Sequence, residues 1–228
     1  MRRLISSRFV IEGPVWFDPL HIFLQFGKFH ISRKCYPVKH FEVIDTSWIE
    51  EIDRKDAEGK LEEIYIEIEK RRGKIANIMK VHSLNPESMK AHMDIYTTLM
   101  FGKSGLSREE REMIAVAVSA ANGCDYCINH HAEALNNYWK DEKKLKDFIE
   151  SKLEMPERKQ RMTEYAIKLT KRPRAMEEGD ILILRECGFS DRDILDINMI
   201  ASYFNFVNRI ALGLGVEFSS EEVTGYNV

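Results

Sequence analysis

The chain has 228 residues, of which 44% are hydrophobic and 31% charged, with a formal net charge of -3. This composition is that of an ordinary globular protein, and the length suffices for one large domain or two small ones with a sizeable core. The small negative charge gives no electrostatic basis for binding nucleic acid or an anionic membrane surface. We therefore expect neither partner.

Four cysteines occur along the chain: Cys35, Cys124, Cys127 and Cys187. They are too few for a disulfide scaffold in a chain of this size, and only Cys124 and Cys127 are close in sequence. A Cys-x-x-Cys pair in a reducing compartment is therefore the better interpretation, and we expect a cytoplasmic protein. Cys35 and Cys187 are expected to be small hydrophobic residues.

Residues 1–44 are rich in aromatic and apolar side chains, but charged residues and histidines interrupt them. No uninterrupted apolar stretch approaches the roughly 20 residues of a membrane span. No compact apolar region with a small-residue cleavage site follows the N-terminal arginines, so a secretory signal is not expected. We interpret residues 1–44 as an extension without chemistry, which either packs on the core or on a neighbouring subunit or lies upstream of the natural start. Residues 45–228 are expected to form the helical domain.

From about residue 45 the pattern is helical almost throughout. Ser47 to Glu50 has the Ser-x-x-Glu form of a capping box. Apolar spacing, caps and breakers then predict helices over about 61–70, 86–100, 107–121, 124–139, 141–151, 156–171, 177–186 and 190–212. No alternating run is bounded by a hairpin turn, so the sequence predicts an all-α fold.

The helix expected over 107–121 is apolar on nearly every side, which indicates a central position in the bundle. The last long helix begins in the same way, because Ser190–Asp193 repeats the capping pattern of Ser107–Glu110. At this offset of 83 residues further positions correspond: Ile114 with Ile197, Ser119 with Ser202, Asn122 with Asn205, Glu112 with Leu195, Cys124 with Val207, and Cys127 with Ile210. We interpret the match as a degenerate internal duplication in which one copy holds the polar chemistry and the other packs.

Residues 122–131 concentrate the reactive side chains. Cys124 and Cys127 are three positions apart at the start of an expected helix, and His131 follows four positions later. One helical face therefore presents both sulfurs and the imidazole. A helix N-terminus lowers the pKa of a thiol, and His131 can accept the proton of Cys127, so the group can make and break a disulfide. The same side chains could hold a metal ion with water as a further ligand, or the cysteines could simply pack.

Three more residues are candidates for the site. Glu112 lies twelve positions before Cys124, near the start of the apolar helix. It is either buried and paired, because an unpaired buried carboxylate is costly, or it lies in the polar first turn, where the helix dipole favours it. His130 is expected to face solvent or another subunit. Tyr126 either donates a hydrogen bond into the site or packs.

Together, these residues are similar to the Glu-x11-Cys-x-x-Cys-x3-His signature of the alkyl hydroperoxidase D group, in the carboxymuconolactone decarboxylase-like superfamily. The resemblance covers residues of about 45–217 and extends to the peroxidase-related branch of that superfamily. The further motifs that carry it are Ala57-x-Gly59-Lys60, Ile64-Tyr65, Lys74–Met79, Ser83–Pro86, Arg111–Ala115, Cys127–Leu135 and Tyr203–Arg209.

The resemblance implies an all-helical fold of duplicated units, assembled as trimers or dimers of trimers, and a thiol peroxidase without haem, flavin or metal. It implies that Cys127 is the peroxidatic cysteine, which forms a sulfenic acid, and that Cys124 is the resolving cysteine. His131 resembles the base and Glu112 the far end of the proton relay. Tyr126 departs from the family, which has histidine there, and a tyrosine with an ordinary pKa of about 10 is a poor proton shuttle near neutrality.

We therefore predict a cofactor-free, thiol-dependent hydroperoxide reductase that forms a homo-oligomer. Its expected partners are a hydroperoxide substrate and a dithiol or thioredoxin-like reductant. The alternatives are a protein disulfide oxidoreductase or redox adaptor, a metal-binding helical module, and an inert oligomeric scaffold. Residues that would serve lactone decarboxylation are not evident.

Overall fold

The computed structural model describes residues 46–226, so the expectations for residues 1–44, Cys35 included, lie outside the described part. Residues 46–226 contain helices and no strand, which confirms the all-α prediction. The α-helices are α1 (Gly59–Arg72), α2 (Asn77–Lys80), α3 (Pro86–Phe101), α4 (Arg108–Asn122), α5 (Asp125–Trp139), α6 (Glu142–Ile149), α7 (Glu157–Lys171), α8 (Glu178–Glu186), α9 (Asp191–Leu214) and α10 (Ser220–Val223). None of these helices is long and apolar enough to cross a membrane.

Local residues explain several helix ends. Asn85 accepts a hydrogen bond from the Ser88 N–H at the start of α3, and complete capping boxes begin α4 and α9 at Ser107 and Ser190. Gly123, with φ of 67°, ends α4 in the left-handed conformation that glycine adopts without steric cost.

One predicted start is wrong. No helix begins at Ser47, whose hydroxyl donates instead to the Ile49 carbonyl at 3.3 Å. The neighbouring Trp48 N–H donates to the carbonyl of Leu214 at 2.8 Å, which holds this segment against the end of α9. Tertiary contacts therefore take the place of the expected cap. The four-residue helices α2 and α10 were not predicted, because they are too short to show a helical period.

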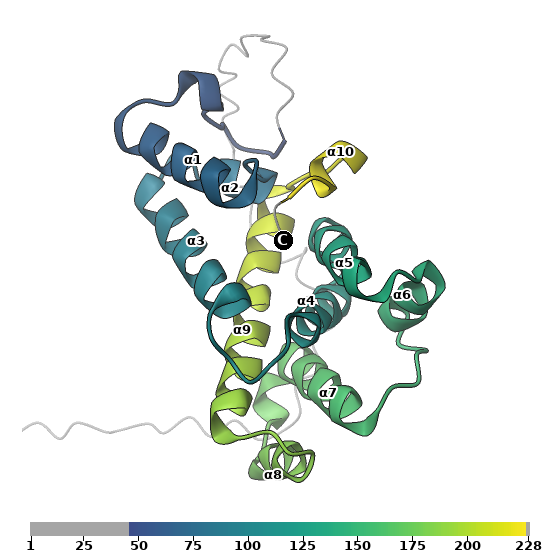
Figure 1. The fold of residues 1–228 in the computed structure, drawn as a ribbon. Coiled ribbons are helices and arrows are strands. Elements are labelled where there is room, and N and C mark those ends of the chain that lie inside the picture. The colour runs from purple at the N-terminus through teal and green to yellow at the C-terminus, as the bar shows by residue number, and fades with distance from the viewer. Residues whose placement is uncertain (1–45, 227–228) are drawn as a thin grey trace, which may run out of the picture. The chain divides into compact units, whose positions relative to one another are not determined.

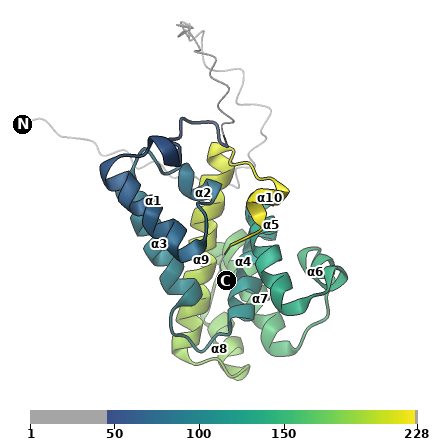
Figure 2. The ribbon, with the colours of Figure 1, turned by 45° about the horizontal axis from the view of Figure 1, so that its top comes forward.

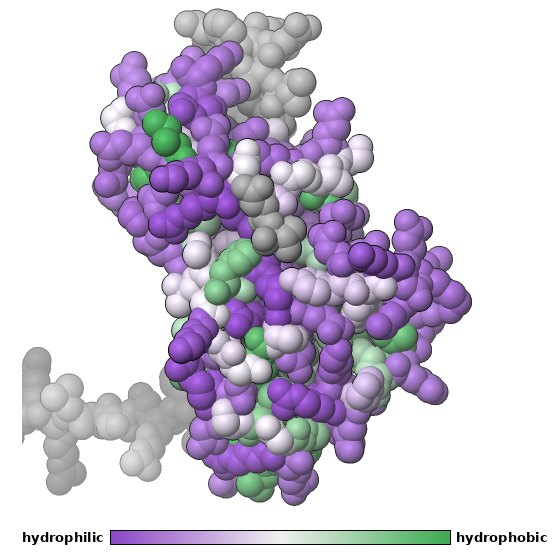
Figure 3. All heavy atoms as spheres, in the orientation of Figure 1, coloured by the Kyte–Doolittle hydropathy of each residue, from purple (hydrophilic) through white to green (hydrophobic). Residues whose placement is uncertain are grey.

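Helix α4 lies at the centre of the helices that follow it, and it contacts α5, α7 and α9 (Figures 1 and 2). Its interior residues Met113, Ile114, Ala115, Val116 and Val118 are fully buried. Helices α1 and α3 pack side by side and enclose a second apolar cluster, and α3 also contacts α9. On the face drawn in Figure 3, hydrophilic residues predominate over α1 and α6. The core thus lies between the helices, as the apolar pattern of 107–121 predicts.

The two segments related by the offset of 83 residues meet in the structure. Asn122, which ends α4, donates from Nδ2 to Oδ1 of its counterpart Asn205 at 3.1 Å and to Oδ1 of Asn208 at 2.9 Å. Asn208 is fully buried and donates in turn to the Ser119 hydroxyl at 3.2 Å. This network of side chains joins the end of α4 to the middle of α9, next to the turn that carries Cys124.

We expect Asn122→Ala to lower the free energy of unfolding by about 1–3 kcal/mol, because it leaves the buried Asn208 carbonyl oxygen without its donor. Urea denaturation measures the change. The matched control is Asn129→Ala, which removes an exposed asparagine side chain on α5 and should change stability by less than about 0.5 kcal/mol. Equal effects of the two substitutions would contradict a stabilising role for the network.

Candidate active site

The Cys-x-x-Cys pair lies at the N-terminus of α5. Gly123 turns the chain out of α4, Cys124 is the N-cap of α5, and Cys127 lies in its first turn. The amide groups of a helix N-terminus stabilise negative charge, so this position favours a thiolate. The structure thus brings both sulfurs to the end of a helix, as predicted.

The two cysteines are free, buried and in contact, with their Sγ atoms 2.7 Å apart and residue exposures of 1% and 2%. A disulfide bond has an S–S length of about 2.04 Å, so its formation requires a movement of less than about 1 Å. A disulfide bond between the two residues would therefore need only a small change in their positions.

The sulfur–sulfur contact shifts the pKa values of the two cysteines in opposite directions. The hydrogen bond with Cys127 lowers the pKa of Cys124, although burial opposes this effect. The hydrogen bond with Cys124, together with burial, raises the pKa of Cys127, while a hydrogen bond from Asn208 lowers it. The contact alone therefore favours a thiolate on Cys124 and a proton on Cys127, so a thiolate on Cys127 requires that this proton move to another acceptor.

Glu112 is buried and paired, which settles the two interpretations that the sequence left open. Its carboxylate is 0% exposed, with Oε2 2.7 Å from His131 Nδ1 and Oε1 2.6 Å from Arg108 Nη2. Burial raises the pKa of Glu112, but the charge and hydrogen bond of His131 and the charge of Arg108 outweigh it, and the pKa is lower than usual. The ionised carboxylate therefore holds the proton of His131 on Nδ1 and leaves Nε2 to accept another.

A cavity of about 240 Å³ brings the reactive groups together. Cys127 and His131 line it, with Tyr126 and His130. Most of the other lining residues are apolar or aromatic, among them Met79, Met93, Tyr96, Tyr203 and Phe204. Cys124 does not line this cavity. It borders a second one, of about 370 Å³, with Trp48, Leu212 and Phe218.

His130 does not face solvent, and the other expectation, that it faces another subunit, stays a prediction. Its side chain is 12% exposed and its Nε2 contacts Glu222 Oε2 on α10. Tyr126 also reaches Glu222, donating to Oε1 at 3.1 Å while it accepts from the Ile78 N–H at 3.0 Å. Burial raises the pKa of Tyr126 well above its usual value, so the hydroxyl keeps its proton. Both side chains thus hold α10 against the cavity.

Four residues at the site were not predicted from the sequence: Arg108, Glu222, His92 and Tyr203. Arg108 could have been found, because it precedes Glu112 by one helical turn with opposite charge. Glu222 follows His130 by 92 residues, and nothing in the local pattern of α10 indicates that it returns to the site. His92 and Tyr203, which also line the cavity, come from α3 and α9. Within residues 46–226, no group of three or more His, Cys, Asp or Glu side chains is arranged to hold a metal ion.

Comparison with known proteins agrees with this fold. Residues 86–155, which include Glu112, Cys124, Cys127 and His131, match the carboxymuconolactone decarboxylase family. The uncharacterized protein YdfG of Bacillus subtilis (strain 168) is 26% identical over 145 residues, which cover 61% of this chain and 95% of YdfG.

Two crystal structures share the fold. The alkylhydroperoxidase AhpD core of an uncharacterized peroxidase-related protein from Ralstonia eutropha JMP134 is 29% identical, with a TM-score of 0.71 over 78% of this chain and 95% of that one. An uncharacterized peroxidase-related protein from Silicibacter sp. TM1040 is also 29% identical, with a TM-score of 0.71 over 80% and 97% of the two chains. Residues 86–155 thus resemble the carboxymuconolactone decarboxylase family, and the helical fold is similar to that of alkylhydroperoxidase D-like proteins.

Proposed function

We propose that this protein is a thiol-dependent hydroperoxide reductase, with Cys127 as the peroxidatic and Cys124 as the resolving cysteine. The observation that carries the proposal is the cavity in which Cys127 lies with His131, whose other ring nitrogen is held by the buried Glu112. The peroxidase-related relatives support a role in peroxide metabolism.

The proposed chemistry uses these groups in sequence. His131 Nε2 takes the proton of Cys127, and Glu112 stabilises the imidazolium that forms. The Cys127 thiolate attacks the terminal oxygen of the hydroperoxide, so that an S–O bond forms and the O–O bond breaks. The leaving alkoxide takes the proton from His131. The Cys124 sulfur then attacks the sulfenic acid, forming the disulfide and releasing water, and a dithiol reductant returns two electrons.

We expect Cys127→Ser to abolish hydroperoxide consumption, because no thiolate remains in the cavity. Without added reductant, Cys124→Ser should consume about one equivalent and retain Cys127 as a sulfenic acid, whereas the wild-type protein should form the disulfide, because only the wild-type protein has a second cysteine that condenses with the sulfenic acid. The matched control is Cys187→Ser, which removes the half-buried free thiol after α8 and should keep full turnover. Stopped-flow measurement of hydroperoxide loss checks the series, with dithiothreitol as reductant where turnover is measured. Full turnover by the Cys127 variant would rule out the proposed mechanism.

We expect Glu112→Gln to reduce the rate of Cys127 oxidation about 10²-fold, because the His131 imidazolium loses its counter-charge. The same change should lower the free energy of unfolding by about 3 kcal/mol at pH 5, because Arg108 and His131 lose a buried carboxylate. The control is Glu62→Gln on α1, which is an exposed position. If the Glu112 and Glu62 variants react at the same rate, the relay is excluded.

The difference in the free energy of unfolding between the wild-type protein and Glu112→Gln should decrease as the pH falls. The folded-state pKa of Glu112 is below its unfolded value of about 4.3, so the carboxylate stabilises the fold above about pH 4.3. This contribution is lost as the pH falls through the folded-state pKa. Urea denaturation should therefore show a difference between the wild-type protein and Glu112→Gln at pH 5 that shrinks on further acidification. A difference that grows below pH 4 would contradict the ion pairing.

The second cavity favours one alternative, a protein disulfide oxidoreductase. Cys124 is reached from this cavity, and Trp48, Leu212 and Phe218 at its border are 75%, 46% and 40% exposed. An apolar surface beside a resolving cysteine suits either a reductant or a protein substrate. Under our proposal, the reduced protein reacts faster with tert-butyl hydroperoxide than with a disulfide-bonded protein such as insulin, as measured by loss of free thiol. The opposite order would favour the alternative.

A further inference from the structure

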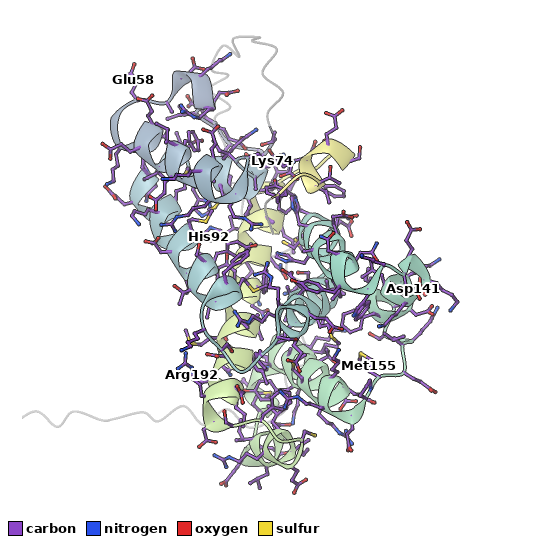
Figure 4. The ribbon with its side chains drawn as sticks, viewed as in Figure 1. Glu58, Lys74, His92, Asp141, Met155 and Arg192 are labelled. Carbon is purple, nitrogen blue, oxygen red and sulfur yellow. The ribbon has the colours of Figure 1, made fainter. Side chains whose placement is uncertain are left out.

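A second chain of polar groups, separate from Glu112 and His131, ends at the cavity. His82, which follows α2, places Nδ1 2.8 Å from the Ile78 carbonyl oxygen, and its Nε2 lies 3.3 Å from Nδ1 of His92 on α3. Nε2 of His92 lies 2.8 Å from the hydroxyl of Tyr203 on α9. His92 and Tyr203 are 5% and 6% exposed, and both line the cavity. Figure 4 labels His92, on the helix that packs against α9.

The Ile78 carbonyl sets the direction of every hydrogen bond in this chain. A carbonyl oxygen only accepts, so His82 must carry its proton on Nδ1. Burial lowers the pKa of His82, and burial with the nearby His82 lowers that of His92 to about 3, so both rings are neutral at pH 7. His82 Nε2 is then an acceptor, and His92 must donate to it from Nδ1. His92 Nε2 is left without a proton and accepts from the Tyr203 hydroxyl.

This series of hydrogen bonds therefore fixes the direction in which the Tyr203 hydroxyl donates. Its proton points to His92, and only the lone pairs of its oxygen remain for the cavity. The chain also has no outlet for a proton, because it ends at a backbone carbonyl. Burial raises the pKa of Tyr203 well above its usual value, so the hydroxyl is not a source of protons. Tyr203 thus offers the cavity a hydrogen-bond acceptor rather than an acid.

We propose that the Tyr203 oxygen accepts the O–H of a neutral hydroperoxide and positions its terminal oxygen for attack by Cys127. The inference rests on the proposed peroxidase function. In the step derived above, the S–O bond forms at the oxygen that keeps this hydrogen, and the O–O bond breaks. The proton of the leaving alcohol comes from Cys127 through His131. The hydrogen bond to Tyr203 therefore persists in the sulfenic acid, and the cavity selects peroxides that carry an O–H.

The kinetic test compares two electrophiles that react with the same thiolate. For Tyr203→Phe we expect the second-order rate constant with tert-butyl hydroperoxide to fall about tenfold, the value of one hydrogen bond of about 1.4 kcal/mol. The rate with methyl methanethiosulfonate, which has no O–H or N–H, should not change. The matched control is Tyr165→Phe, which removes another buried hydroxyl, one that accepts from Asn198 outside the cavity, and should leave both rates unchanged.

A second measurement tests the polarity without any turnover. Long-range proton–nitrogen NMR spectra of the reduced protein should show His82 and His92 as neutral rings protonated on Nδ1. A proton on Nε2 of His92 overturns the inference. The inference also fails if Tyr203→Phe lowers both rates equally or leaves both rates unchanged. Absence of any hydroperoxide reaction in the wild-type protein instead rejects the proposed function, and the NMR result remains an independent test of the chain.

Discussion

The site depends on one buried negative charge. A carboxylate without exposure is costly in an apolar helix unless cations and donors surround it. Here α4 supplies both Glu112 and Arg108 one turn apart, and α5 supplies His131 from the other side. The requirement to pair this charge fixes how α4 and α5 face each other, and with it the direction in which the first turn of α5 presents Cys127. The same interaction that pairs the buried charge therefore also fixes the orientation of the His131 imidazole at the cavity.

The sequence predicted the elements well because their signals are local. Capping boxes, Asn85-Pro86 and Gly123 mark helix ends within four residues, and the apolar run of α4 indicates its central position. The spacing from Glu112 to His131 likewise needs only two consecutive helices. Ser47 failed for the opposite reason, because its segment is held by the end of α9, about 165 residues away. No local pattern contains that contact.

The parts of the site that the sequence did not predict come from distant segments. His92 on α3 and Tyr203 on α9 line the cavity, and Glu222 on α10 contacts Tyr126 and His130. All three reach the site through tertiary packing alone. The expected duplication also gave only part of the site. The offset of 83 pairs Asn122 with Asn205, which are hydrogen-bonded in the structure, but the interpretation assigned only packing to the second copy. The histidine–tyrosine chain joins that second copy to the cavity at Tyr203, a position which the alignment does not single out.

Tyr126 connects the motif to the end of the described chain. Its hydroxyl donates a hydrogen bond to Glu222 Oε1, which also accepts from the Asn77 N–H and the Tyr226 hydroxyl. His130 contacts the other carboxylate oxygen of Glu222. Val223 and Tyr226, which follow Glu222 in the chain, form part of the cavity wall. The residue between the two cysteines is thus hydrogen-bonded to the segment that forms this part of the wall. Where the related signature has a histidine, this chain has a tyrosine whose hydroxyl keeps its proton and ties the turn of the two cysteines to the C-terminal side of the cavity.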